Sequence, residues 1–131
     1  MDHISQEKTI ISSIVVVGHC GFDSPGLRRW VKKTLPDVEV AVVNRQAQLA
    51  PFLNGQSLLL INRVLDGRFD RRSGLDMIQD LGTQNDPPRM MLISNYPEAQ
   101  AEAQAVGARP GVGKKQLKTA EAKERLIQAA A

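Results

Sequence analysis

The chain has 131 residues, a length that suits one domain with a single core. Its formal net charge is only +3, and the basic residues are spread out with few aromatic side chains, so direct nucleic-acid binding is not expected. The single cysteine, Cys20, excludes an internal disulfide, and no apolar run reaches the roughly 18 residues of a membrane helix. Residues 1–9 are polar and do not resemble a signal peptide. We therefore expect a flexible lead over residues 1–9, one domain over residues 10–131 and a cytoplasmic location.

Strands and helices are predicted to alternate along the domain. Runs of β-branched and other aliphatic residues predict strands that are covered on both faces. In chain order these runs are residues 10–17, 38–43, 57–61, 90–93 and 109–112. A helical pattern follows each run, over residues 24–35, 47–53, 75–81, 97–106 and 119–130. Ser24 is expected to cap the first helix with Pro25 at its first position, and Gly107 is expected to close the fourth.

This order of elements predicts an α/β fold. Five strands that alternate with helices over short connections indicate a parallel sheet with helices on both faces. Right-handed crossovers favour a flavodoxin-like, doubly wound (βα)5 arrangement with strand order 2-1-3-4-5. The carboxyl ends of the strands would then meet at one edge, where such proteins place their chemistry. Asn62, which directly follows the apolar run 58–61, would lie at this edge.

The segment from Pro88 to Leu117 resembles the second half of the receiver domain of bacterial response regulators, which act in two-component systems and phosphorelays. It has a strand that ends on a small hydroxyl residue, then a helix, a Gly-Ala pair, a short strand and a lysine. By this resemblance Ser94 stands at the family's Thr/Ser switch position, and Gly107-Ala108 is its Gly-Ala pair. Lys114, or as second choice Lys115, is the lysine that contacts the phosphoryl group in the family.

The chain departs from the family where phosphorylation takes place. Receivers accept the phosphoryl group on an aspartate at the position of Asn62, and two adjacent acidic residues after the first strand hold Mg²⁺. Here the first strand runs into Gly18-His19, which is not acidic. An amide does not form an acyl phosphate, and Mg²⁺ needs carboxylate oxygens. The resemblance therefore implies a pseudo-receiver with no catalytic residue, no metal and no cofactor. Its degenerate phosphoacceptor pocket would consist of Gly18, His19, Asn62, Ser94 and Lys114.

A domain of this kind would signal through protein–protein interaction rather than act as an enzyme. Its partner would be another signalling protein or its own output domain. In the family the commonest dimer surface consists of the fourth helix, the fifth strand and the last helix. The corresponding segments are the helix Pro97–Val106, the strand Arg109–Val112 and the last helix, which would also form a homodimer here.

Other interpretations stay open. A cysteine in a glycine-flanked loop after the first strand resembles the phosphocysteine loop of sugar phosphotransferase IIB proteins, so Cys20 could carry a phosphoryl group. Alternatively, Lys114 with Ser94 and possible contacts from Arg63 and Lys115 would bind a small anion at the strand ends. The simpler alternatives are that Asn62 ties strand ends together and that Lys114 pairs with Asp66 or Asp70. Asp23, Asp66 or Asp70 could also turn inward and rebuild an acidic pocket.

Overall fold

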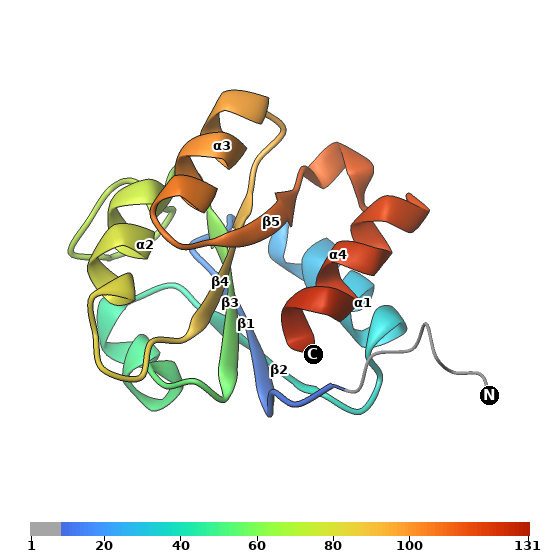
Figure 1. Ribbon diagram of the computed structural model, residues 1–131, viewed down its shortest axis with the longest axis horizontal. Coiled ribbons are helices and arrows are strands. Elements are labelled where there is room, and N and C mark those ends of the chain that lie inside the picture. Colours follow the sequence, from blue (N-terminus) through green and yellow to red (C-terminus); the bar gives the residue numbers. More distant parts are fainter. Residues whose placement is uncertain (1–8) are drawn as a thin grey trace.

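The computed structural model describes residues 9–131, and its centre is a parallel sheet (Figure 1). The strand order is β2-β1-β3-β4-β5, so the predicted fold and strand order are confirmed. The strands are β1 (Ser13–Val17), β2 (Glu39–Val43), β3 (Ser57–Asn62), β4 (Arg89–Ile93) and β5 (Arg109–Val112). The flexible lead was predicted for residues 1–9, and of these only Thr9 lies within the described residues.

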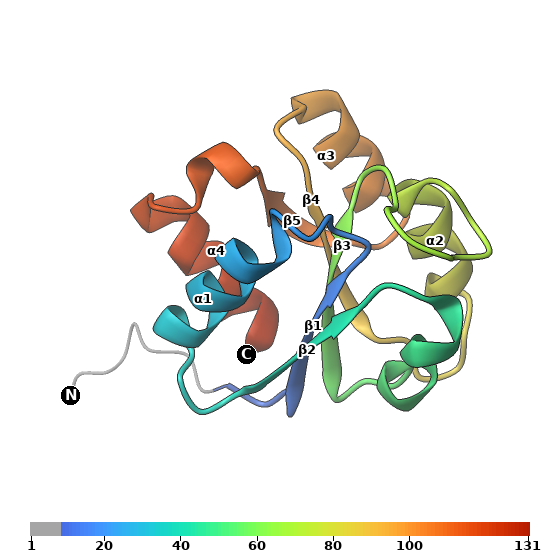
Figure 2. The same ribbon diagram turned by 180° about the vertical axis from the view of Figure 1, so that it is seen from behind.

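Helices cover both faces of the sheet (Figure 2). One face carries α1 (Ser24–Thr34) and α4 (Ala120–Ala130). The other carries the 3-10 helix η1 (Gln46–Phe52) with α2 (Gly74–Gly82) and α3 (Pro97–Ala105). A further 3-10 turn, η2 (Lys114–Gln116), follows β5. No helix among residues 9–131 is long and apolar enough to cross a membrane.

The sheet is continuously apolar because both of its faces are buried. Side chains alternate along β1, so Ile14 and Val16 pack in the core under α1 and α4, while Val15 and Val17 pack in the core under α2 and α3. The four residues 58–61 of β3 are fully buried. Each such side chain contributes about 1.5–3 kcal/mol to stability by leaving water. This burial explains why the strands were recognisable from sequence alone.

Two helix predictions need correction. The segment predicted as the second helix is a 3-10 helix, because Pro51 lies inside it and has no N–H to donate to an α-helical hydrogen bond. α1 begins at Ser24 with Asp23 as its N-cap, one residue earlier than predicted. The Ser24 hydroxyl does not cap the helix and instead donates to the carbonyl oxygen of His19. The loop between β1 and α1 is thereby fixed to the start of the helix.

Candidate functional site

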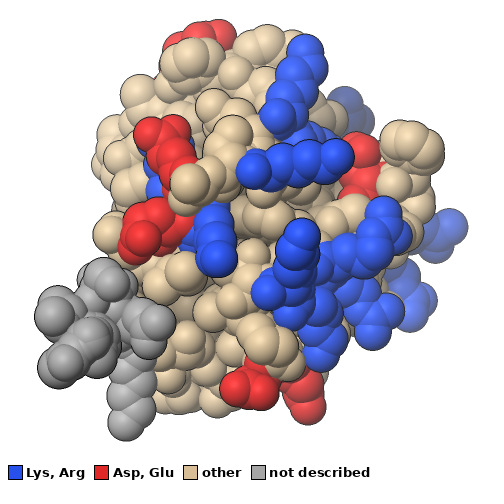
Figure 3. Space-filling view, turned by 90° about the vertical axis from the view of Figure 1, so that its right-hand side faces the viewer, with Lys and Arg blue, Asp and Glu red and all other residues tan. Residues whose placement is uncertain are grey.

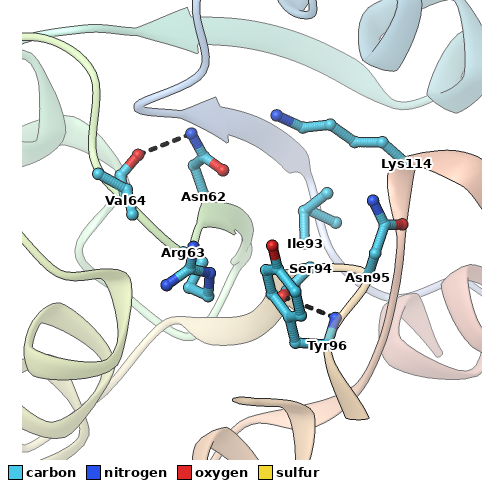
Figure 4. A pocket seen from close by; sticks show the side chains of 8 residues that line it. All are labelled: Asn62, Arg63, Val64, Ile93, Ser94, Asn95, Tyr96 and Lys114. Atoms are coloured by element: carbon cyan, nitrogen blue, oxygen red, sulfur yellow. Dashed lines mark hydrogen bonds between the residues drawn. The ribbon is translucent and has the colours of Figure 1, made fainter. Parts of the chain in front are cut away.

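A cavity of about 170 Å³ opens at the carboxyl ends of β3 and β4 (Figure 4). The polar residues that line it come from the ends of these two strands and from η2. They are Asn62, Arg63, Ser94, Asn95, Tyr96 and Lys114. Three of the residues predicted for the degenerate pocket, Asn62, Ser94 and Lys114, therefore share one cavity.

Asn62 holds two strand ends together. Its Nδ2 donates to the carbonyl oxygen of Gly18 at 3.0 Å and to that of Val64 at 2.7 Å. Gly18 has a φ of 73°, a conformation that favours glycine, and a Cβ there would lie 2.7 Å from Leu65 Cδ2. Gly18 therefore contributes its carbonyl group rather than a lining side chain. This arrangement agrees with the interpretation of Asn62 as a structural amide.

His19 is buried beneath the strand ends and does not line the cavity. It is 2% exposed, and its Nε2 lies 3.0 Å from the carbonyl oxygen of Leu60. A carbonyl oxygen only accepts, so Nε2 carries the hydrogen. Burial lowers the pKa of His19 to about 4, although the hydrogen bond to Leu60 opposes this shift. The imidazole is therefore neutral at pH 7, and its Nδ1 has no partner among residues 9–131.

Lys114 forms an ion pair with Asp23, so the alternative pairing with Asp66 or Asp70 does not form. The Lys114 Nζ lies 2.8 Å from Asp23 Oδ2, and both side chains are about one-third exposed or less. This hydrogen bond is the main reason that the pKa of the Asp23 carboxyl lies below its usual value. The pair links η2 to the start of α1 along one wall of the site.

The opposite wall consists of Arg63 and the residues after β4. The Arg63 guanidinium lies 4.8 Å from the centre of the Tyr96 ring, a cation–π contact. Ser94 Oγ accepts from the backbone N–H of Tyr96 at 3.1 Å, and Asn95 Oδ1 accepts from the backbone N–H of Lys115 at 3.2 Å. The Lys115 side chain is exposed and is not part of the lining, unlike that of Arg63.

Sequence reasoning missed Asn95 and Tyr96 as members of this site. The only available signal was their position directly after Ser94, at the end of a predicted strand. No residue pattern indicated that the Tyr96 ring would turn toward Arg63. That contact depends on how the loops after β3 and β4 approach each other in space.

Within residues 9–131, acidic side chains do not gather into a metal site. Among residues 9–131 there is no group of three or more His, Cys, Asp or Glu side chains placed to hold a metal ion. Asp23 is paired with Lys114. The backbone N–H groups of Asp66 and Asp70 bind the Gly18 carbonyl and the Gln46 side chain and so anchor the loop after β3.

Cys20 lies on the loop between β1 and α1 and is partly buried. Its side chain is one of the lesser causes that lower the pKa of the Asp23 carboxyl, after the hydrogen bond from Lys114. The phosphocysteine hypothesis stays a prediction, and no other feature of the site favours it.

Solved structures similar to this chain include response regulators and their receiver domains. Comparison with protein-family models and with curated proteins gave no match. The signal receiver domain of a DNA-binding response regulator from Colwellia psychrerythraea matches over 90% of this chain and 95% of that chain, with 13% identity and a TM-score of 0.63. A DNA-binding response regulator of the LuxR family from Staphylococcus aureus matches over 91% and 95%, with 11% identity and a TM-score of 0.65. A bacteriophytochrome response regulator matches over 87% and 78%, with 16% identity and a TM-score of 0.62. The chain therefore has the fold of response regulator receiver domains, the family that its sequence resembles.

Proposed function

We propose that this chain is a receiver-like signalling domain that acts by contacting another protein, without enzymatic activity and without aspartyl phosphorylation. The fold and the sequence resemblance support the receiver part of this proposal. The observation that supports the absence of aspartyl phosphorylation is the amide of Asn62 at the end of β3. Its amide is a poor nucleophile, and it already donates to the carbonyl oxygens of Gly18 and Val64.

The neighbouring side chains also support a domain that is not phosphorylated. The Mg²⁺ ion used by the family binds carboxylate oxygens. Here the position after Gly18 holds the buried, neutral His19, and the nearby Asp23 is engaged by Lys114. These residues do not fit a Mg²⁺ ion, so the pocket lacks the charge neutralisation on which phosphoryl transfer depends.

The surface proposed for a partner or a second copy consists of α3, β5 and α4. Ala99 and Ala103 face the sheet, which leaves the acidic Glu98 and Glu102 exposed on α3. Small residues between them allow another helix to approach closely. The partner would be a signalling protein or an output domain that binds one constant conformation of this domain.

Beryllofluoride, which mimics a phosphoryl group on an acceptor aspartate, tests the proposal directly. The backbone amide spectrum of the ¹⁵N-labelled domain should stay unchanged when beryllofluoride and Mg²⁺ are added together. The intact mass should also stay unchanged after incubation with acetyl phosphate and Mg²⁺. Shifts centred on Asn62 and Ser94 that require Mg²⁺, or a gain in mass of one phosphoryl group, would contradict the proposal.

Anion binding in the same cavity is a second candidate function. The observation that favours it is that Lys114 and Arg63 line one cavity together with the hydroxyl of Ser94. Two cations and a hydroxyl suit phosphate, sulfate or a carboxylate. An incoming anion would compete with Asp23 for Lys114, so affinity should depend on that ion pair.

A further inference from the structure

The outer edge of β2 is a row of unpaired backbone groups. The N–H of Glu39 donates to Ser12 O, and the N–H of Gly18 donates to Val43 O, so Glu39, Ala41 and Val43 direct their backbone groups toward β1. This direction alternates along a strand, so the N–H and C=O groups of Val40 and Val42 point away from the sheet. Nothing within residues 9–131 bonds to these outward groups.

The side chains of Val40 and Val42 lie on the face of the sheet that α1 covers. Val40 packs against the core beneath α1, and Val42 is 38% exposed. Val42 forms the floor of a groove of about 670 Å³ between the edge of the sheet and the helix. The other residues that line this groove belong to α1: Ser24, Pro25, Arg28, Arg29, Lys32 and Lys33.

The groove is strongly basic. Arg28, Arg29, Lys32 and Lys33 are all exposed, and no acidic side chain among residues 9–131 forms an ion pair with them. Glu39 lies on β2, but alternation places its carboxylate on the opposite face of the sheet. Lys and Arg side chains accordingly gather on the side of the molecule that carries α1 and α4 (Figure 3).

We propose that the β2 edge and the basic groove of α1 together bind an extended acidic segment of a partner protein, which adds to the sheet as a further strand. The backbone of that segment would bond to Val40 and Val42, and every second side chain would lie over the groove. Acidic residues at those alternate positions would meet Arg28, Arg29 and Lys32. This inference rests on the proposed function, because it names a surface and a partner chemistry for a domain that signals by protein contact.

Two other occupants fit the groove less well. The phosphates of a nucleic acid accept hydrogen bonds but do not donate, so they leave the outward carbonyl groups of Val40 and Val42 unsatisfied. A second copy of the chain, paired edge to edge through β2, would bring two sets of four basic side chains together. An acidic peptide satisfies both the donors and the acceptors and carries the opposite charge.

The probe for this proposal is a fluorescent peptide of about eight residues in which Glu and Val alternate, a length typical of one strand. It should bind saturably, and binding should slow hydrogen exchange at the amides of Val40 and Val42. The amides of Ala41 and Val43 already bond to β1 and should not change. A matched peptide with the same charges, but with N-methyl groups that block its strand hydrogen bonds, should bind at least about tenfold more weakly, a difference of about 1.4 kcal/mol.

The double variant Arg28→Glu with Lys32→Glu should weaken binding of the acidic peptide by at least about tenfold. The matched control is Arg72→Glu with Lys118→Glu, two reversals of exposed charges on the loops after β3 and after η2, outside the groove, which should leave binding unchanged. All four side chains are exposed, so neither double change should prevent folding.

Three outcomes would overturn the proposal. They are absence of peptide binding, equal binding of the N-methylated peptide, or tighter binding of a single-stranded oligonucleotide without protection of Val40 and Val42. The proposed function fails separately, through a response to beryllofluoride. A failed peptide experiment without that response would reject this surface and leave the proposed function intact.

Discussion

The Asn62 Nδ2 lies 3.0 Å from the carbonyl oxygen of Gly18, which joins the carboxyl end of β3 to that of β1. The same nitrogen donates to Val64 O, so both of its hydrogens point at carbonyl oxygens. A carboxylate has no hydrogen to donate and would be repelled by both oxygens. The position is therefore built for an amide rather than for the acidic residue that receivers carry there.

The first prediction is that Asn62→Asp lowers the free energy of unfolding by about 2 kcal/mol at pH 7, because two hydrogen bonds are lost. Urea denaturation measures this change. Asn95→Asp is the matched control, because Asn95 uses its Oδ1 to accept from the N–H of Lys115, and a carboxylate oxygen accepts equally well. Equal losses in the two variants would show that the hydrogen bonds of Asn62 are not the cause.

The second prediction concerns stability between pH 7 and pH 4. Burial holds the pKa of His19 at about 4 in the folded chain, against 6.5 in the unfolded chain. As the pH falls, the unfolded state therefore binds a proton at a higher pH than the folded state does. The free energy of unfolding should keep its full value above pH 6.5 and fall by about 3 kcal/mol between pH 6.5 and about pH 4. Denaturant unfolding at several pH values measures this decline.

His19→Gln is the control for the pH dependence. The glutamine amide can still donate toward Leu60 O but does not titrate, so the decline between pH 6.5 and pH 4 should disappear. Asp23 affects the free energy of unfolding at a lower pH. Its pKa is lowered from 3.8 in the folded chain, so its contribution to that free energy is lost only in more acidic solution. An unchanged decline in the His19→Gln variant would contradict the role given to His19.

The sheet could be predicted from sequence because each strand is a run of aliphatic residues buried on both faces. Residues 58–61 show this most clearly, since all four are fully buried. The position of Asn62 at the sheet edge followed from the same pattern. A short helix predicted over residues 47–53 does form as η1, and Pro51 inside it makes it a 3-10 rather than an α-helix.

The contacts within the site could not be predicted in the same way. Asn62 binds backbone carbonyl groups, which no residue pattern identifies. The ion pair between Asp23 and Lys114 joins residues 91 positions apart in sequence. The inward orientation of His19 depends on the packing beneath the strand ends. Such contacts depend on the approach of loops in three dimensions, whereas the strands depend on local composition.

The third prediction tests anion binding in the cavity at the strand ends. Millimolar phosphate should raise the melting temperature of the domain, because an anion that binds only the folded state stabilises it. Lys114→Ala should abolish this gain, whereas Asp23→Asn should increase it by releasing Lys114 from its ion pair. The exposed Lys115→Ala serves as the control and should behave like the unchanged protein. No effect of phosphate in any of these proteins would reject the site.

The fourth prediction concerns the close approach of α2 to β3. A Cβ at Gly74 would overlap the backbone oxygen of Asn62, and backbone atoms at the end of a strand paired on both sides cannot move aside cheaply. Gly74→Ala should therefore lower the free energy of unfolding by about 3 kcal/mol and shift the side-chain amide resonances of Asn62. Urea denaturation and NMR measure these two effects.

Gly21→Ala is the matched control for that change. Nothing lies within 4 Å of a Cβ at Gly21, so this variant should be neutral or slightly more stable, because alanine restricts the unfolded chain. If Gly74→Ala were equally neutral, α2 would be free to move away from β3. The hydrogen bonds of Asn62 to Gly18 and Val64 would then not depend on a fixed position of that helix, and the strand end would be more mobile than its packing indicates.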